Sequence, residues 1–391
     1  MKIIKPLLNV ANRELTRMLG KWPYLFIIFI GPLLAFLVIL WTFSANVPSN
    51  LPISVVDEDH TSVSRLISRM VDATSIAKIV QSVPDLATAK QEMEKGGIEA
   101  ILYIPSNTEK EIIRGRSAEI ALYVNNVNVL KGGLLSSSIS KTITTISAGM
   151  ESQMRMKRGA SNSEALQQTM PVMLHTEVLF NPFINYSYFL TSSLLPVMLI
   201  VFTLLGSVYT LGNELKNGTA SEWLKKADNN ILVALMGKMI PYTIAFGSMA
   251  MLMNLILFSY LGVPMKGHFQ MIILGELLMI LSYQFLAVFL VGLTYNLRLS
   301  LSVASAYTMM ALTFSGLTFP IFAMPPIART LAHLFPFTYW LKIFISQALR
   351  GEPAINALYP MYAFWLFIFL GALFIPRLNY VMKNEKYWGR F

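Results

Sequence analysis

Residues whose types suggest chemistry are few and dispersed in this chain. Cysteine is absent, which excludes Cys-based catalysis and Cys-ligated metal sites. Residues 57–60 (Asp-Glu-Asp-His) could bind a cation, but a polar turn between a strand and a helix, capped by Thr61 or Ser62, explains them more simply. The four histidines lack metal-ligand spacing; they are His60, His175, His268 and His333. We therefore predict no catalytic residue and no metal site.

The run from Lys131 to Thr142 (KGGLLSSSISKT) has the composition of a phosphate-binding loop. It lacks the G-x-x-x-x-G-K-[ST] spacing in which backbone amides surround a phosphate, so the similarity is attributed to chance. No cofactor is therefore expected on this chain.

Most of the elements that the sequence predicts for the whole chain are membrane helices. Hydrophobic residues make up 54% of the 391 residues and charged residues 13%, and the mean hydropathy is +0.55. Long runs without charges match the roughly 20 helical residues that cross a bilayer. Six are predicted, at 24–43, 183–211, 239–261, 271–293, 299–321 and 360–376. The first lacks a small-residue cleavage site and is interpreted as an uncleaved anchor.

The positions of Lys and Arg predict the orientation. Fourteen lie in the proposed inner segments 1–23, 212–238, 298 and 377–391, against four in the short outer loops. Both termini and the 212–238 loop are therefore expected in the cytoplasm, and residues 44–182 outside. The formal charge of +10 then lies mainly on the inner membrane face, which indicates topology and contact with anionic lipid rather than nucleic acid.

The outer segment 44–182 is predicted to be an α/β domain inserted between the first two spans. Its strands are expected at 53–56, 76–83, 98–104 and 119–124, with helices at 61–73 and from Pro84 to Lys95. This order implies a small mixed or parallel sheet with helices on its faces. A long helix from Leu130 to Arg158 and a shorter one from Ser163 to Met170 follow. The apolar stripe of the long helix either packs on the sheet, or the helix forms a stalk or binds a partner.

The inner loop carries a recognisable pattern. It contains Glu214, then Gly218 and Thr219, then Glu222, Trp223 and Leu224, and a Gly-Lys pair at 237–238. The pattern resembles ABC-2 type transporter permeases, in which this stretch forms a coupling helix. Gly218 is expected to break the preceding helix and Thr219 to cap a short one, from which residues 222–224 project. Asp-Asn-Asn at 228–230 departs from the Thr-Pro of many relatives.

The resemblance extends along most of the chain. Arg13 and Glu14 lie in a segment, 1–23, similar to the family's amphipathic elbow helix, and 55–60 and 101–105 are similar to the subgroup with a large extracytoplasmic domain. Segment 322–350 resembles an outer re-entrant segment, so Pro325, Pro336 and Tyr339 are candidates for an outer gate or path.

The resemblance implies a function and a set of partners. The chain would be the permease subunit of an exporter in the bacterial inner membrane, moving an amphipathic, lipid-like or drug-like compound outward. ATP and Mg would bind a separate ABC ATPase, because the chain has no Walker motif. A second permease chain, the same or a paralogue, would complete a dimer, and subgroup members often use a periplasmic adaptor.

Glu276 is the one ionisable residue expected well inside a span. It is interpreted either as a polar contact in the transport path or with segment 322–350, or as an interfacial carboxylate that reaches water or Lys266. Two other functions stay open: an ion-coupled carrier, disfavoured because such sites usually need paired acidic groups, and a sensor or scaffold, disfavoured because no inner signalling domain is evident.

Overall fold

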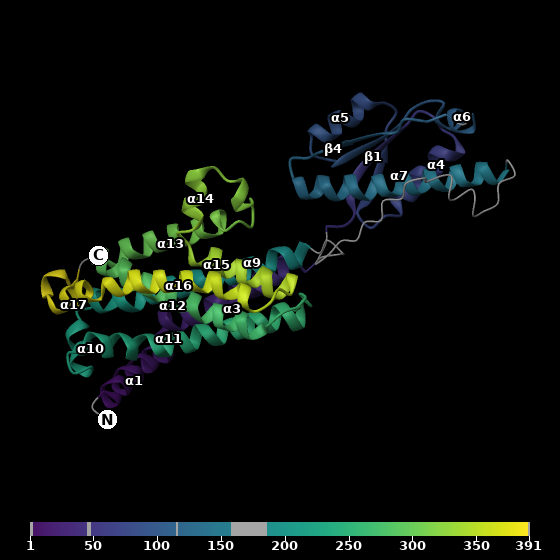
Figure 1. The fold of residues 1–391 in the computed structure, drawn as a ribbon. Helices are drawn as coiled ribbons and strands as arrows, with labels where there is room; N and C mark the ends of the chain where they lie inside the picture. The colour runs from purple at the N-terminus through teal and green to yellow at the C-terminus, as the bar shows by residue number, and fades with distance from the viewer. Residues whose placement is uncertain (1–2, 45–47, 115, 158–185, 390–391) are drawn as a thin grey trace. The chain divides into compact units, whose positions relative to one another are not determined.

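The structure, a computed structural model, describes residues 3–44, 48–114, 116–157 and 186–389. It divides into two compact units (Figure 1): a helical unit, formed by residues 1–46 and 179–391, and a sheet unit, formed by residues 47–178. Each unit is described separately below.

The helical unit contains six helices that are long and apolar enough to cross a membrane, among the described residues. They span Trp22–Thr42, Ser187–Lys216, Ile231–Tyr260, Phe269–Thr294, Leu297–Phe314 and Ile355–Lys383. The number predicted from the sequence is confirmed. In order, the elements are α1 (Ile4–Gly20), α2 (Trp22–Leu25), η1 (Phe26–Ile30), α3 (Gly31–Thr42), α9 (Tyr186–Lys216), α10 (Ala220–Lys226), α11 (Ile231–Asn254), η2 (Leu255–Tyr260), α12 (Phe269–Thr294), α13 (Leu297–Phe314), η3 (Ile321–Ala323), α14 (Pro326–Ala332), α15 (Pro336–Phe344), η4 (Ile345–Arg350), α16 (Ile355–Leu373), α17 (Ile375–Lys383) and η5 (Glu385–Tyr387).

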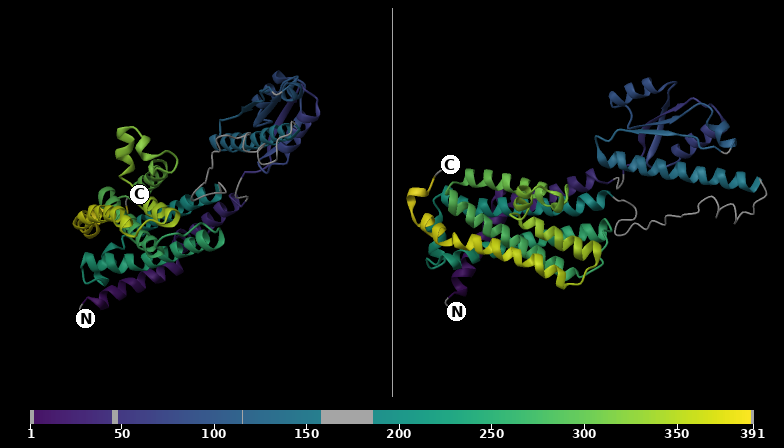
Figure 2. Two further views of the ribbon diagram at one scale, coloured as in Figure 1. Left: turned by 45° about the vertical axis from the view of Figure 1, so that its right-hand side comes forward. Right: turned by 45° about the horizontal axis from the view of Figure 1, so that its top comes forward.

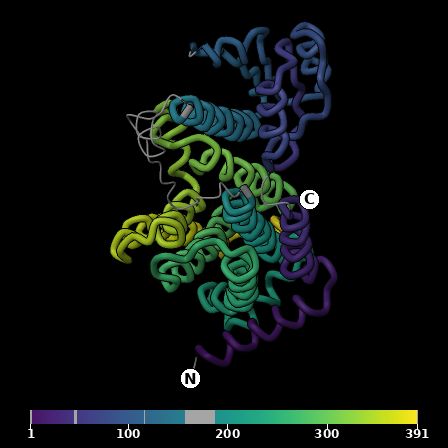
Figure 3. The backbone as a smooth tube through the Cα atoms, turned by 90° about the vertical axis from the view of Figure 1, so that its right-hand side faces the viewer, coloured from purple at the N-terminus to yellow at the C-terminus, as the bar shows by residue number. Residues whose placement is uncertain are grey.

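Helix α12 packs against most other long helices of this unit, including α9, α11, α13 and α16 (Figure 2). Its contact with α16 is close, because a Cβ on Gly371 of α16 would collide with the backbone of Phe285 on α12. Helix α1 runs along the outside of the bundle, where it packs against α11 (Figure 3). The large apolar core of this unit therefore forms around α12 and excludes water from the side chains between the helices.

Several predicted helix boundaries were wrong. The second span continues to Lys216 and the third begins at Ile231, so the predicted 212–238 loop shrinks to a short stretch around α10. The fifth span ends at Phe314 instead of 321, because Gly316 takes a left-handed conformation with φ of 92°. The last begins at Ile355 instead of 360, and Pro360 lies inside this helix.

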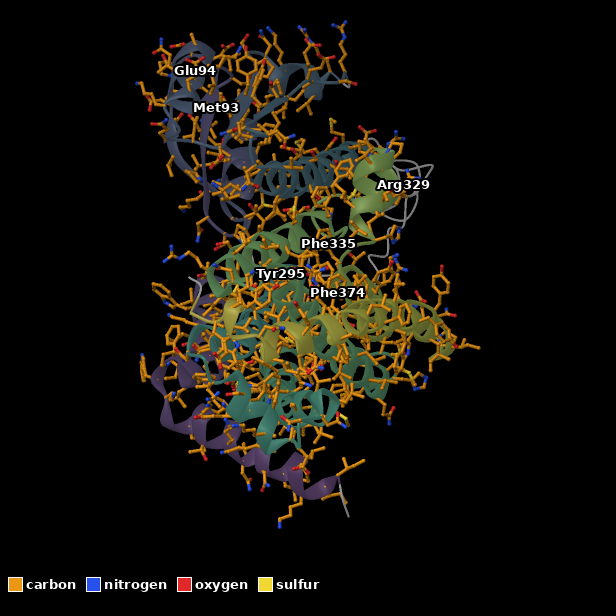
Figure 4. All side chains as sticks on the ribbon, turned by 90° about the vertical axis from the view of Figure 1, so that its left-hand side faces the viewer. Met93, Glu94, Tyr295, Arg329, Phe335 and Phe374 are labelled. Atoms are coloured by element: carbon orange, nitrogen blue, oxygen red, sulfur yellow. The ribbon has the colours of Figure 1, made fainter. Side chains whose placement is uncertain are left out.

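Segment 322–350, predicted to be re-entrant, forms the short helices α14 and α15 and the π-helical turn η4. Arg329, labelled in Figure 4, donates hydrogen bonds to the carbonyls of Phe322 and Met324, at 2.8 and 3.3 Å. Phe335, also labelled there, packs against the ring of Tyr307 on α13, with 4.9 Å between centroids. The Arg329 bonds hold the segment together internally, and the Phe335 contact joins it to α13.

The sheet unit has four strands in the order β2-β1-β3-β4: β1 (Leu51–Asp57), β2 (Ala77–Ser82), β3 (Ala100–Ile104) and β4 (Ala121–Val124). β1 pairs in parallel with β2 and β3, and β4 is antiparallel to β3. Its helices are α4 (Ser62–Asp72), α5 (Leu86–Glu94), α6 (Thr108–Ile113) and α7 (Val129–Lys157). Apolar residues of α4 and α7 pack on one face and those of α5 on the other. Of the two sheet types that the sequence left open, mixed and parallel, the structure shows the mixed one.

The details of this unit agree with the sequence in part. The turn at 57–60 is a polar turn, because Asp57 accepts the amides of Asp59 and His60 and Thr61 caps α4. The stripe of α7 packs on the sheet through Leu135 and Ile139, which confirms the packing interpretation. Helix α6 was not predicted, and α5 is capped by Asp85 rather than started at Pro84. The helix predicted at 163–170 lies outside the described residues.

Candidate functional site

Five charged side chains from three helices meet at one end of the helical unit. Arg13, Glu14 and Arg17 come from α1, Glu214 from the last turn of α9 and Lys238 from α11. We call these five residues the charge cluster. The side chains of Glu14, Glu214 and Lys238 are 0% exposed, and those of Arg13 and Arg17 are 7% and 15% exposed. Buried charges of this number require direct partners.

Glu214 is the centre of the charge cluster. Arg13 donates to its two carboxylate oxygens through Nη1 and Nη2, at 2.7 and 2.8 Å, and Arg17 pairs with the same carboxylate. Lys238 Nζ lies 2.8 Å from Glu214 Oε1, and the Thr219 hydroxyl donates to Oε2 at 2.5 Å. The paired guanidinium bonds fix the angle between α1 and α9 as well as their distance.

Glu14 closes the charge cluster on the side of α11. Its Oε1 lies 2.8 Å from Arg13 Nη1 and 2.9 Å from Lys238 Nζ, and Tyr242 donates its hydroxyl to Oε2 at 3.1 Å. The cluster thus has three cations and two carboxylates, and each carboxylate has several donors. Burial by itself lowers the pKa of Arg13. Its hydrogen bonds and charge interactions with Glu214 and Glu14 together outweigh this effect, so the pKa is raised. Arg13 therefore remains charged.

The local sequence explains why Glu214 lies on a helix rather than in a loop. The first residue that breaks α9 is Gly218, which has φ of 65°, so the helix continues through Lys216. Thr219 occupies the N-cap position of α10, yet its side chain caps nothing and bonds Glu214 instead. The break at Gly218 confirms that prediction, whereas the side-chain cap predicted for Thr219 was wrong because the buried carboxylate takes its hydroxyl.

One face of helix α10 packs against other helices of the same chain. Trp223 is 0% and Leu224 2% exposed, and Lys238 Nζ lies 5.0 Å from the centroid of the Trp223 ring. The expectation that these two residues project from the helix was therefore wrong: they pack into the core formed with α1, α9, α11 and α17. The exposed face carries Glu222, Lys225 and Lys226. A partner that approaches α10 meets this charged face.

The exit from α10 uses the Asp-Asn-Asn sequence. Asp228 and Asn229 take left-handed conformations, with φ of 52° and 59°, which these residue types tolerate better than most. Asn230 then caps α11 by accepting the amide of Leu232 at 2.9 Å. This short turn starts α11 close enough to α9 for Lys238 of α11 to contact Glu214.

The sequence identified part of this site. Arg13, Glu14, Glu214 and Thr219 are brought together, whereas Glu222 remains on the exposed face. Three partners were missed: Arg17, Lys238 and Tyr242. Arg17 lies one turn after Arg13 on an amphipathic helix, and the Gly-Lys pair at 237–238 was noted as a pattern, so two of the three left a weak signal in the sequence.

The candidates for a path or gate are not part of the charge cluster. Pro325 is exposed before α14, and Pro336 is buried in the first turn of α15, where the structure of proline suits a helix start. Tyr339 is half-buried, with its hydroxyl 3.2 Å from His333 Nδ1. Glu276 is 2% exposed and accepts a hydrogen bond from Asn254 Nδ2 at 2.8 Å, which contradicts the interpretation of Glu276 as a water-exposed interfacial carboxylate.

Comparison with known proteins identifies a family and two relatives of this chain. The family model described as "ABC-2 family transporter protein" matches residues 22–375. The chain is 23% identical over 368 residues to the inner membrane transport permease YhhJ of Escherichia coli (strain K12), and this alignment covers 90% of each chain. The inner membrane transport permease YhhJ of Shigella flexneri matches with the same identity and coverage. Because the family model covers most of the chain, this protein belongs to the ABC-2 family of membrane transport permeases.

Proposed function

We propose that this chain is the permease subunit of an ATP-driven exporter and that a separate ABC ATPase binds the exposed face of α10. The observation that carries the proposal is the charge cluster. It joins the end of α9 to α1 and α11 directly beside α10. A force applied to α10 would therefore reach three helices of the bundle through short, buried contacts.

The proposed topology places α1, α10 and α17 on the cytoplasmic side and the sheet unit outside. Its support is the Lys and Arg distribution: residues 212–238 and 377–391 each hold four cationic residues. The inner membrane relatives support a multi-pass protein of the bacterial inner membrane. The Lys and Arg distribution supports the placement of both termini in the cytoplasm. In this arrangement α10 meets a cytoplasmic partner and the sheet unit meets extracytoplasmic ones, among them an adaptor protein.

The proposed mechanism uses the buried contacts as a rigid joint. ATP and Mg bind to the ATPase, and its closure displaces α10. Because the buried ion pairs cannot be broken without a large cost in free energy, α1, α9 and α11 move together with α10. A second permease chain, the same or a paralogue, supplies the other half of the path. The free energy that drives this movement comes from the difference in contacts between two states of the assembly.

The proposed cargo is an amphipathic, lipid-like or drug-like compound. Its support is the apolar character of the spans and their exposed side chains, such as Leu37, Trp365 and Phe369, which suit contact with lipid. Permeases of this kind would not catalyse a reaction themselves, and ATP hydrolysis belongs to the partner subunit.

The test is reconstitution of the chain with its ABC ATPase in lipid vesicles that contain a fluorescent phospholipid analogue. We expect ATP-dependent movement of the probe, and loss of this movement in a Lys225→Glu/Lys226→Glu variant. The matched control, Lys90→Glu/Lys141→Glu, reverses two exposed charges in the sheet unit and should retain movement. Movement that needs no ATP and follows an imposed proton gradient would contradict the proposal and favour an ion-coupled carrier.

A further inference from the structure

Glu276 and Asn254 form an isolated polar pair between α12 and α11. Glu276 is 2% and Asn254 3% exposed, and Glu276 lies seven residues into α12, about 10 Å along the helix at 1.5 Å per residue. Next to it, Gly275 leaves room for the apolar Ile343 of α15. Asn254 is the last residue of α11 before the π-helical turn η2, a local irregularity often found at functional positions.

Two of the four polar side-chain atoms in this pair lack a hydrogen-bond partner among the described residues. Asn254 Nδ2 donates to Glu276 Oε2 at 2.8 Å. The other two oxygens, Glu276 Oε1 and Asn254 Oδ1, are buried and have no hydrogen-bond partner among the described residues. Both are acceptors if Glu276 is ionised, so neither can satisfy the other. Leaving them unpaired is costly in a buried site.

We propose that Glu276 is a proton-binding site. A proton on Oε1 turns this atom into the donor that Asn254 Oδ1 lacks, and the pair then becomes a closed ring of two hydrogen bonds between a carboxylic acid and an amide. One proton thus satisfies both orphaned oxygens and ties α12 to α11. This inference does not depend on the proposed export function.

Charged residues and tyrosines lie on the elements that pack against α12. Glu276 is the one charged residue type within α12, and α16 has none. The helices packed against α12 carry these charged residues: Glu214 and Lys216 (α9), Lys238 (α11), Arg298 (α13), Lys342 (α15), Arg350 (η4), Arg377 and Lys383 (α17). The tyrosines of these elements whose side chains the structure describes are Tyr188, Tyr209, Tyr242, Tyr283, Tyr307, Tyr339, Tyr359, Tyr362 and Tyr380, and η2 carries Tyr260.

Three of these cations have partners other than Glu276. Lys238 is in the charge cluster, Lys342 Nζ lies over the Tyr339 ring at 5.5 Å from its centroid, and Arg350 pairs with Glu352 at 3.3 Å. Among the described residues, the hydrogen-bond partner found for Glu276 is the neutral amide of Asn254. Glu14 and Glu214 are equally buried, but each contacts three cations. They therefore serve as ionised carboxylates in the same chain with which Glu276 can be compared.

Two measurements on the full chain in lipid test the proposal. The first is the infrared difference spectrum between wild type and Glu276→Gln at neutral pH. We expect a carbonyl band of a protonated carboxylic acid that is lost in the variant. Glutamine can form the same two hydrogen bonds with Asn254, so the variant should fold normally. A spectrum in which the variant loses only carboxylate bands would overturn the proposal.

The second measurement uses the wild type alone and does not depend on how the variant folds. A hydrophobic carbodiimide reacts with a protonated carboxyl: the acid adds across one C=N bond, and rearrangement leaves a stable N-acylurea that carries the whole reagent. We expect mass spectrometry to find this adduct on Glu276 and not on Glu14 or Glu214. Equal labelling of all three, or labelling of Glu14 and Glu214 alone, would contradict a proton held at Glu276.

Discussion

Glu214 is surrounded by cations that other parts of the chain deliver to it. Arg13 and Arg17 are 201 and 197 residues away in sequence and Lys238 is 24 residues away, yet all three contact its carboxylate. Removing the carboxylate leaves three buried positive charges near one another with Glu14 as their remaining acidic partner. The effect on stability should therefore exceed that of an ordinary surface substitution.

We predict that Glu214→Ala lowers the free energy of unfolding by about 3–5 kcal/mol, the cost of breaking a buried ion pair from one side. The matched control is Glu222→Ala, eight residues further on, whose side chain is exposed. Thermal unfolding of the purified chain in lipid nanodiscs measures both. A shift for Glu214→Ala no larger than that of the control would show that the charge cluster does not hold the helices together.

For single residues, the sequence identified several that belong to the site, but it did not identify their contact partners. Glu214 and Thr219 were identified from a short local pattern, which is visible in one sequence. Tyr242 bonds Glu14 across 228 positions, and no periodicity reports a contact of that separation. Glu276 was recognised because a charge interrupts an apolar run, but its partner Asn254 is a neutral residue on another helix and left no signal.

Helix α10 shows the limit of sequence patterns at the scale of an element. An apolar Trp beside a charged stretch indicates one buried face, but it does not say whether that face packs on the same chain or on a partner. Here Trp223 packs on the same chain. The helices and strands themselves were predicted well, because their periodicity is local, whereas their ends depended on tertiary contacts such as the Thr219 hydroxyl bond to Glu214.

We predict that Trp223→Ala destabilises the chain by about 3–5 kcal/mol, because it leaves a cavity where a large buried ring had been. Trp223→Phe fills more of that space and should cost less. Thermal unfolding distinguishes the two variants. If Trp223→Ala kept full stability and still lost ATPase binding, Trp223 would be a direct partner contact and the seating of α10 described above would be wrong.

The crossover from α4 to β2 in the sheet unit depends on Asp72. Its Oδ1 accepts the amide of Ile79 at 2.8 Å and Oδ2 pairs with Lys78 at 3.1 Å. The backbone hydrogen bond from Ile79, followed by the bond from Lys78, lowers the pKa of Asp72. A carboxyl whose pKa is lowered by folding stabilises the folded state above its unfolded pKa, and this contribution is lost as the pH falls through the lowered value.

We therefore expect the Ile79 amide to be more protected from hydrogen exchange in wild type than in Asp72→Ala at neutral pH. This difference should disappear once the pH falls below the lowered pKa of Asp72. Comparing the two chains at each pH cancels the intrinsic pH dependence of exchange. A difference that persists unchanged into strong acid would mean that the carboxylate charge does not contribute to the crossover.

For the whole molecule, composition and length were sufficient to predict six spans and one inserted domain. The reason is that crossing a bilayer sets a minimum apolar length, which a single sequence displays directly. The orientation of the spans is a separate prediction from the Lys and Arg count, and it decides whether α10 can meet a cytoplasmic ATPase.

The absence of cysteine makes the orientation testable with single-cysteine variants. Ser106 in the sheet unit and Lys226 on α10 are both exposed. We predict that Ser106→Cys reacts with a membrane-impermeant thiol reagent in intact cells and that Lys226→Cys reacts only after permeabilisation. The reverse pattern would overturn the proposed topology and the ATPase site together.

The most direct test of the central claim is to identify what touches α10 in the cell. A photo-crosslinking amino acid in place of Glu222 lies on the exposed face, beside Lys225 and Lys226 and away from the buried Trp223. The same amino acid in place of Ser106 serves as the control. We predict that Glu222 yields a covalent product with a polypeptide that mass spectrometry identifies as an ABC ATPase, and that Ser106 does not. An ATPase captured at Ser106, or no ATPase captured at Glu222 in a folded and inserted chain, would contradict the account.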